Sequence, residues 1–354
     1  MAATTSNTPG VLGEHEAEIN QHIQLYISAR VPEFRRLTEL REKGWNNPAG
    51  DKFFENQRRQ ADKADDKQAQ VFFKIMVRVG REIHSNTAVF DIKAPPNGPP
   101  RILDMCAAPG AFLLVAKENN PRAHVDAFSL PSDMGGHKVL LRSKLKIDVK
   151  FLDVTMLAAD VGVESIPPDH PDFENFLPRH FQPHDVFDLV ICDGQVLRTH
   201  QREPYREKRE ALRLRMTQLV IGLEHMRPGG TMLVLLHRIE LWMNVLLLRT
   251  FCKFSSVQVY KPNTSHAKRS SFYMVASNIQ SRHEDAIAAV ETWKQLWKSA
   301  TFDSEEECSP LNRSLQPEPQ ELLDDFGPRL VELGREVWAT QARGLAGASF
   351  IVDS

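Results

Sequence analysis

The sequence predicts an α/β fold in which a mainly parallel, doubly wound sheet of seven strands carries helices on both faces. Between residues 101 and 252, short apolar runs alternate with helical patterns, which is typical of parallel strands joined by crossover helices. The last two apolar runs, 256–260 and 271–277, are separated by a loop with no room for a helix. They therefore form an antiparallel hairpin, which supplies one antiparallel edge strand.

The individual elements follow from hydrophobic periodicity. Strands are expected at about 101–105, 123–128, 147–151, 186–192, 231–236, 256–260 and 271–277. Helices are expected between them at about 111–118, 135–144, 205–226 and 240–252.

Further helical patterns lie on either side of this region. Before it come 14–43, with a break at Pro32, and 51–83; the Pro-rich linker 94–100 then leads into the first strand. After it come helices at about 282–299 and 318–342, separated by an acidic segment. We expect a disordered tail at 1–13, a helical region at 14–98, the sheet domain at 99–280 and a helical extension at 281–354.

Composition limits the classes of function. The chain has 354 residues, 42% of them hydrophobic, and a formal net charge of −2. That charge excludes a generally basic nucleic-acid coat protein but leaves room for a local basic groove. The four cysteines show no C-x-x-C pair, which argues against a disulfide framework and against a zinc site. No apolar run reaches the ~20 residues of a membrane helix, and no signal peptide is apparent, so we expect an intracellular protein, cytoplasmic or nuclear.

The stretch from Asp104 to Phe112 is the most informative part of the chain. A short strand ends in an acid, a small-residue turn with Pro109-Gly110 follows, and a helix begins. Such a turn lets a ligand approach the backbone, and the helix end offers N–H groups without partners. An ordinary strand–turn–helix connection explains the pattern equally well. The G-x-G-x-x-G and P-loop fingerprints are absent.

Three further strand ends carry polar residues where ligands bind in open α/β sheets. The second strand ends at Ser129, with Asp126 inside it as a ribose contact or a strand-edge charge. Asp153 follows the third strand, where it is an adenine contact or a helix N-cap. Asp193 ends the fourth strand in an Asp-Gly turn and is the best candidate for a carboxylate facing a ligand.

The order of these motifs resembles the FtsJ-like ribose 2′-O-methyltransferase superfamily over about residues 71–278, and most closely its fungal members. The matching segments are D-M-C-A-A-P-G-A-F, D-V-T, D-L-V-I-C-D-G, R-P-G-G-T-M-L-V-L-L, V-Y-K-P and S-S-F-Y-M-V-A-S. The resemblance implies a Rossmann-like methyltransferase fold, S-adenosylmethionine as cofactor and RNA as substrate. The cofactor-binding residues it implies are Asp104, Ala107, Pro109, Gly110, Ala111, Phe112, Ser129, Asp153 and Asp193.

The family's catalytic set is a Lys–Asp–Lys–Glu tetrad, and this chain matches half of it. Lys74 stands at the first lysine and Asp193 at the aspartate, but Leu235 replaces the second lysine and Ser271 the glutamate. His237 lies two residues after Leu235, so on a strand it faces the same side and is a candidate base with a pKa near neutrality. Alternatively, it caps the strand.

The basic segment 198–215 follows Asp193 and is a candidate contact for an RNA backbone. Its interleaved glutamates favour instead a helix face with internal ion pairs. Three functions are therefore carried forward: methylation of an RNA ribose, methylation of a small molecule with His237 as base, and SAM or RNA binding without catalysis.

Overall fold

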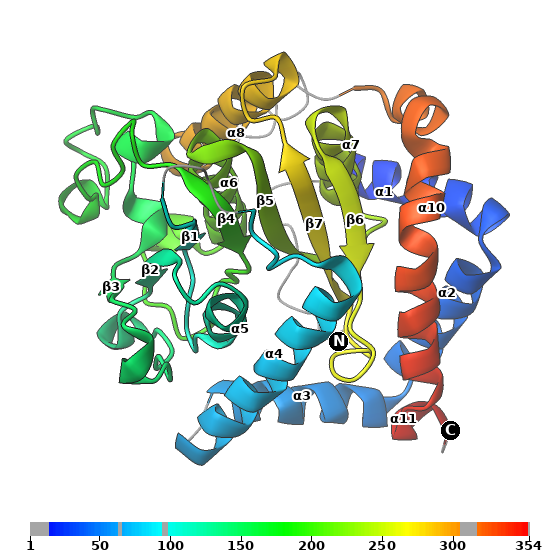
Figure 1. Ribbon diagram of the computed structural model, residues 1–354. Helices are drawn as coiled ribbons and strands as arrows, with labels where there is room; N and C mark the ends of the chain where they lie inside the picture. The colour runs from blue at the N-terminus through cyan, green and yellow to red at the C-terminus, as the bar shows by residue number, and fades with distance from the viewer. Residues whose placement is uncertain (1–13, 63–65, 94–97, 305–316, 353–354) are drawn as a thin grey trace.

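The computed structural model describes residues 14–62, 66–93, 98–304 and 317–352. Within them, seven strands form one sheet in the order β3-β2-β1-β4-β5-β7-β6 (Figure 1). The strands are β1 Arg101–Asp104, β2 His124–Ser129, β3 Val149–Phe151, β4 Phe187–Cys192, β5 Met226–His237, β6 Ser256–Tyr260 and β7 Ser271–Ile279. All seven expected strands are confirmed, with small shifts at their ends.

The sheet is parallel except at one strand. β7 runs antiparallel to both β5 and β6, and β6 is the outermost strand of the hairpin that the short loop required. On the other side, β1 pairs with β2 and with β4. Successive strands are added on one side of β1 up to β3 and then on its other side from β4 onward, so the strand order switches between β1 and β4. In such sheets the crevice at that point is the usual ligand site.

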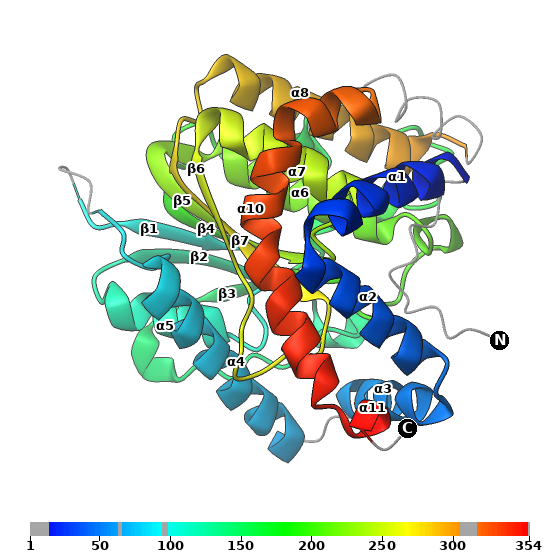
Figure 2. The same ribbon diagram turned by 90° about the vertical axis from the view of Figure 1, so that its right-hand side faces the viewer.

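Helices cover both faces of the sheet, as Figure 2 shows edge-on. The first half of the chain supplies α1 Glu14–Arg30, α2 Pro32–Trp45, α3 Pro48–Asp62, α4 Asp66–Thr87 and α5 Ala111–Asn119. The second half supplies α6 Glu210–Glu224, α7 Trp242–Phe254, α8 Glu284–Phe302, α10 Pro319–Ala346 and α11 Ser349–Val352. Among the described helices, none is long and apolar enough to cross a membrane.

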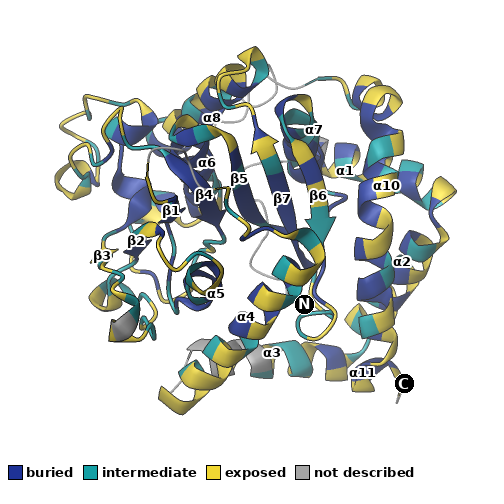
Figure 3. Ribbon diagram, viewed as in Figure 1, coloured by how far each residue is buried: buried dark blue, intermediate teal, exposed yellow. Residues whose placement is uncertain are grey.

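Alternate residues along the strands belong to two different hydrophobic cores. In β4, Leu189 and Ile191 pack with α4 and α5, whereas Val190 and Cys192 pack with α6, α7 and α8. β4 is buried along its whole length, as expected of a central parallel strand with both faces covered (Figure 3). The carboxyl ends of the central strands are thereby held in rigid positions.

The terminal helices pack together beside the β6 edge. Phe34 of α2 meets Trp338 of α10 with ring centroids 5.2 Å apart. Arg329 of α10 donates to the Val257 carbonyl of β6 at 3.1 Å, which occupies an acceptor that an edge strand would otherwise leave open. The expected disordered tail 1–13, and parts of the linkers 94–100 and 303–319, lie outside the described residues.

One expected helix, 135–144, is wrong. That segment is a loop with short 3₁₀ turns at Ser132–Met134 and Ser143–Leu145. Gly135 has φ +90°, and a Cβ there would lie 1.9 Å from the Thr199 carbonyl oxygen. The loop therefore packs against the segment after β4, and this tertiary contact outweighs the local pattern. The expected helix 205–226 begins later, at Glu210, after a 3₁₀ turn at Pro204–Arg206.

Candidate active site at the carboxyl edge of the sheet

The carboxyl ends of β1 to β5 surround one cavity of about 330 Å³. Each of these strands contributes to the lining a polar residue at its end or just beyond: Asp104, Ser129, Asp153, Asp193 and His237. The volume lies at the lower end of the range for small-molecule sites. The structure thus brings together the four strand ends singled out in the sequence, and adds that of β5.

Two carboxyl groups, the buried Asp104 and the half-buried Asp193, end the adjacent strands β1 and β4. The Cys106 N–H donates to Asp104 Oδ1 at 3.1 Å, whereas Asp193 Oδ1 is buried without a hydrogen bond. Burial raises the pKa of Asp193 to about 7, and burial together with the charge of Asp193 raises the pKa of Asp104. Near neutral pH the pair therefore retains a proton, and the Asp193 side chain lines the cavity with one oxygen that has no hydrogen bond.

The turn after β1 forms a wall of small side chains. Ala107, Ala108, Pro109 and Ala111 line the cavity together with Phe112. Gly110 does not line it; this residue has φ +99°, and a Cβ there would lie 2.4 Å from Leu141 Cγ. Glycine is therefore required for the turn, which lets α5 begin with its N–H groups at the cavity wall.

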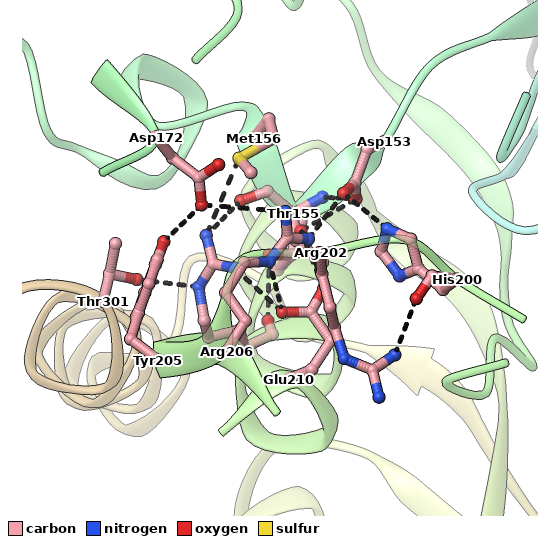
Figure 4. A network of polar contacts seen from close by, with 12 residues as sticks. Asp153, Thr155, Met156, Asp172, His200, Arg202, Tyr205, Arg206, Glu210 and Thr301 are labelled. Atoms are coloured by element: carbon pink, nitrogen blue, oxygen red, sulfur yellow. Dashed lines mark hydrogen bonds and ion pairs between the residues drawn. The ribbon is translucent and has the colours of Figure 1, made fainter. Parts of the chain in front are cut away.

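Asp153, just beyond β3, is the centre of a buried polar network (Figure 4). Its Oδ1 accepts from the Thr155 N–H at 3.0 Å and hydroxyl at 2.8 Å, and its Oδ2 accepts from Arg206 at 2.6 Å. His200 Nε2 lies 3.3 Å from Oδ2. Burial opposes ionisation, but His200 and Arg206 hold the pKa of Asp153 well below its usual range. Asp153 is an N-cap, as one interpretation expected, and its contact with adenine stays a prediction.

The Asp153, His200 and Glu210 side chains offer ligand atoms within 4.8 Å of one another, a spacing compatible with a metal ion. Arg206 already supplies the positive charge there, because its Nη2 lies 2.6 Å from both Asp153 Oδ2 and Glu210 Oε1. This cluster is therefore an internal ion-pair network that joins the loops after β3 and β4.

The expectation that segment 198–215 meets an RNA backbone fails for its central arginines. Arg206, Arg209 and Arg213 are buried. Arg213 donates to Glu210 at 2.9 Å and to the Thr301 hydroxyl at 3.0 Å, so it ties α6 to α8. Glu207 pairs with Arg202 and is exposed, as the alternative predicted, whereas Glu210 pairs with Arg206 and Arg213 inside the protein.

His237 lines the cavity together with Leu235, which confirms that both face the same side of β5. Its Nε2 lies 2.9 Å from Gln195 Nε2, and its Nδ1 lies 3.5 Å from the Ser270 hydroxyl. Burial and the positive charges of Arg215 and Lys261 lower its pKa to about 4. The expected pKa near neutrality is therefore wrong.

Lys74 is not brought to the cavity in this structure. It is exposed on α4, whereas Phe72 and Met76 of the same helix line the cavity. Residues two positions apart on a helix point in different directions, so Lys74 faces away from its neighbours. Asp126 also lies outside the lining and pairs with Arg101 at 2.9 Å, as a strand-edge charge does.

Sequence reasoning missed several residues of the site. His266 and Arg269, in the loop between β6 and β7, line the cavity, as do Gln195 and His200. In the sequence, the length of this loop indicated a hairpin and its K-P turn matched the family, but neither feature indicated a site residue. A basic pair spaced H-x-x-R next to a strand end was a usable signal.

The cavity fits S-adenosylmethionine at two places. Small side chains and the α5 N-terminus suit an amino-acid moiety, because N–H groups at a helix start favour a carboxylate. The Asp104 side chain, which lines the cavity at the end of β1, offers a second polar partner beside the turn. Ala111, Phe112 and Asp104 would hold the group there.

Comparisons with known proteins identify a family. A family model described as FtsJ-like methyltransferase matches residues 82–279, more than half of the chain. No curated protein matches the chain in sequence.

Similar solved structures include an O-methyltransferase family protein from Burkholderia thailandensis, at 11% identity and TM-score 0.33, with 63% of each chain covered. A Plasmodium falciparum protein described provisionally as a ribosomal RNA methyltransferase has 13% identity and TM-score 0.35, covering 58% of this chain and 97% of the other. Human methyltransferase-like protein 13, solved with SAH, has 12% identity and TM-score 0.32, covering 66% and 90%. Structural similarity at these TM-scores does not indicate a substrate.

Proposed function

Because the chain belongs to the FtsJ-like methyltransferase family, we propose that it transfers a methyl group from S-adenosylmethionine to the 2′-hydroxyl of a ribose in RNA. The family makes it a SAM-dependent methyltransferase. The RNA substrate and the roles of individual residues are the proposal.

Asp193 carries the proposal. Its side chain lines the cavity at the end of β4, and its Oδ1 has no hydrogen bond. A substrate hydroxyl in the cavity supplies a donor to this carboxylate. A pKa near 7 lets the carboxylate take the hydroxyl proton at neutral pH, because a general base works best when its pKa is near the working pH.

His237 has a different role from the one expected. With a pKa lowered to about 4 the imidazole is neutral at pH 7, and it is a weaker base than Asp193. Its Nε2 contacts Gln195 and its Nδ1 contacts the Ser270 hydroxyl, and these two contacts orient the ring. We assign it to substrate positioning.

The remaining walls exclude water from the acceptor. Met76 and Tyr273 are buried and line the cavity beside Leu235, which replaces the second lysine of the family tetrad. S-adenosylmethionine, when bound, supplies an electrophilic methyl group on a positively charged sulfur. The protein's contribution is then mainly to hold the hydroxyl in line and to accept its proton at Asp193.

Exposed aromatic and basic groups at the mouth of the cavity support an RNA substrate. Phe72 is 45% exposed yet lines the cavity, which suits stacking on a base, and His137 and Arg269 are exposed residues of the same lining. The burial of the arginines in segment 198–215 supports the second candidate, O-methylation of a small molecule, because it removes the RNA contact expected there.

The test is transfer of labelled methyl groups from S-adenosylmethionine to total RNA and, separately, to a small-molecule extract. We expect label in RNA, reduced by about 10²–10⁴-fold in Asp193→Asn. Asp126→Asn is the matched control, since this carboxylate pairs with Arg101 outside the cavity, and its activity should equal that of the wild type. Label only in the small-molecule fraction favours the second candidate. Cofactor binding without transfer to either favours a non-catalytic role.

A further inference from the structure

Three nitrogen-bearing side chains lie at the β5 end of the cavity. His237 ends β5, and His266 and Arg269 come from the loop between β6 and β7; all three line the cavity. Arginine offers five N–H donors and no acceptor, and each neutral histidine offers one donor. This end of the cavity is therefore rich in donors.

The loop that carries His266 and Arg269 is held from inside by Lys261. The buried Lys261 Nζ donates to the carbonyls of Arg269 at 2.6 Å, Ser271 at 2.8 Å and His266 at 3.3 Å. His266 has φ +63°, an uncommon conformation for a residue with a side chain, and Lys261 secures the carbonyl next to it. The backbone of both residues is therefore held in place before any ligand arrives.

Glu82 of α4 holds the other side of the same loop. Its carboxylate accepts from the Asn263 N–H at 2.6 Å, from the Tyr260 hydroxyl at 3.0 Å and from the Thr264 hydroxyl. Burial opposes ionisation, but these donors outweigh it and lower the pKa of Glu82. The loop is thus a rigid platform tied to α4.

The charges around the histidines are of one sign. Among the described residues, neither His237 nor His266 pairs with a carboxylate. Arg215 of α6, and Lys261, Arg269 and His266 of the loop, add to the effect of burial in lowering the pKa of His237. Asp193 is the carboxyl group at this end of the cavity. Its pKa is raised, whereas pairing with a cation would lower it.

From this arrangement we infer that His266 and Arg269, beside His237, form a subsite for a phosphate group of the substrate, next to the hydroxyl held by Asp193. The inference rests on the proposed function, because in RNA each ribose 2′-hydroxyl stands beside a phosphodiester. The guanidinium binds two phosphate oxygens at once, and the His266 N–H donates to a third. The two residues then position the ribose beside this phosphate relative to Asp193.

The direct test uses inorganic phosphate and the full-length chain. The pKa values of His237 and His266 are measured by NMR titration of the histidine C–H signals, with phosphate and with chloride at equal ionic strength. Phosphate should raise both values, since an anion favours the imidazolium. Arg269→Ala should abolish the rise, and Arg122→Ala, an exposed arginine at the opposite edge of the sheet, should retain it. Equal values in phosphate and chloride would overturn the subsite.

A second test uses kinetics with RNA. Arg269→Ala should raise the KM for RNA about 10–100-fold and change kcat little, while the affinity for S-adenosylmethionine stays that of the wild type. Arg122→Ala should match the wild type, and Arg269→Lys should recover part of the loss. An unchanged KM in Arg269→Ala overturns the subsite even when RNA is methylated. If phosphate shifts the histidines but no RNA is methylated, the subsite stands and the RNA proposal fails.

Discussion

Arg41 in α2 donates a 2.7 Å hydrogen bond to Glu240, three residues after His237 at the end of β5. Both side chains are nearly inaccessible to solvent. Trp338 of α10 donates to the other oxygen of the same carboxylate at 3.1 Å. One buried carboxylate therefore ties helices from both ends of the chain to the turn that follows the active-site strand, which gives those helices a role in positioning His237.

Glu240→Gln should destabilise the protein by about 3 kcal/mol at pH 7, because it leaves Arg41 buried without a charge partner. Burial would raise the pKa of Glu240, but Arg41 and Arg238 lower it to about 2. The stabilisation is therefore present above the unfolded pKa of about 4 and is lost as the pH falls toward 2. Urea unfolding across this range measures the difference between variant and wild type.

The control for Glu240→Gln is Glu336→Gln. Glu336 pairs with Arg343 of the same helix, and both side chains are exposed. Exposed pairs contribute little, so this variant should unfold like the wild type at every pH. Equal stability of Glu240→Gln and the wild type at pH 7 would contradict the proposed link between the terminal helices and β5.

Gly135→Ala and Gly229→Ala form a matched pair. Both glycines have left-handed backbones, at φ +90° and +88°, so both variants incur the same conformational cost of about 1 kcal/mol. A Cβ at Gly135 also meets the Thr199 carbonyl at 1.9 Å, whereas nothing lies within 4 Å at Gly229. Gly135→Ala should therefore lower the melting temperature more.

The same pair distinguishes a local effect from an effect on the site. Thr199 precedes His200, which lines the cavity, so displacement of this segment should weaken the binding of S-adenosylmethionine in Gly135→Ala. Gly229→Ala should bind the cofactor as the wild type does. Calorimetry with each variant measures both affinities, and identical affinities would show that the packing of these two loops does not shape the site.

Much of the fold could be predicted from the sequence, because the strands of this sheet are short apolar runs bounded by turn residues. The loop at 135–144 could not, since Gly135 is placed by a contact with a residue 64 positions away. The same limit applies to Arg206, whose burial depends on Asp153, 53 positions earlier. Periodicity reports local geometry, whereas these residues are placed by partners distant in sequence.

The site was predicted in outline for the same reason. Asp104, Asp153 and Asp193 stand at strand ends, and strand ends meet at one edge of a parallel sheet. The pKa of His237 could not be anticipated, because Arg215 and Lys261, which lower it, come from other elements. The lining residues His266 and Arg269 were missed because a hairpin loop carries no periodic pattern.

The pH dependence of kcat/KM should follow Asp193. The rate should rise with pH through about 7, as the Asp104–Asp193 pair loses its proton, and level off above it. His237, with a pKa of about 4, should add no inflection between pH 5 and 8. The residual activity of Asp193→Asn should lack the inflection near 7. If the inflection near pH 7 persists in Asp193→Asn, another group is the base.

The contribution of Asp193 to stability should show the opposite trend over the same range. The folded pKa of Asp193, about 7, lies above its unfolded value of about 4, so the folded state binds the extra proton. This contribution is full below pH 4 and is lost as the pH rises through 7. Asp193→Asn should remove the part of this decline that Asp193 causes, as measured by urea unfolding at pH 4 and pH 8.

The most direct measurement of the central claim is the position of the methyl group in the RNA product. RNA labelled by the enzyme from S-adenosylmethionine is hydrolysed in alkali, which cleaves only where a free 2′-hydroxyl attacks the neighbouring phosphate. Methylation of the ribose predicts label in alkali-resistant dinucleotides, and its loss in Asp193→Asn. Label recovered in mononucleotides would place the methyl group on a base and would contradict the account.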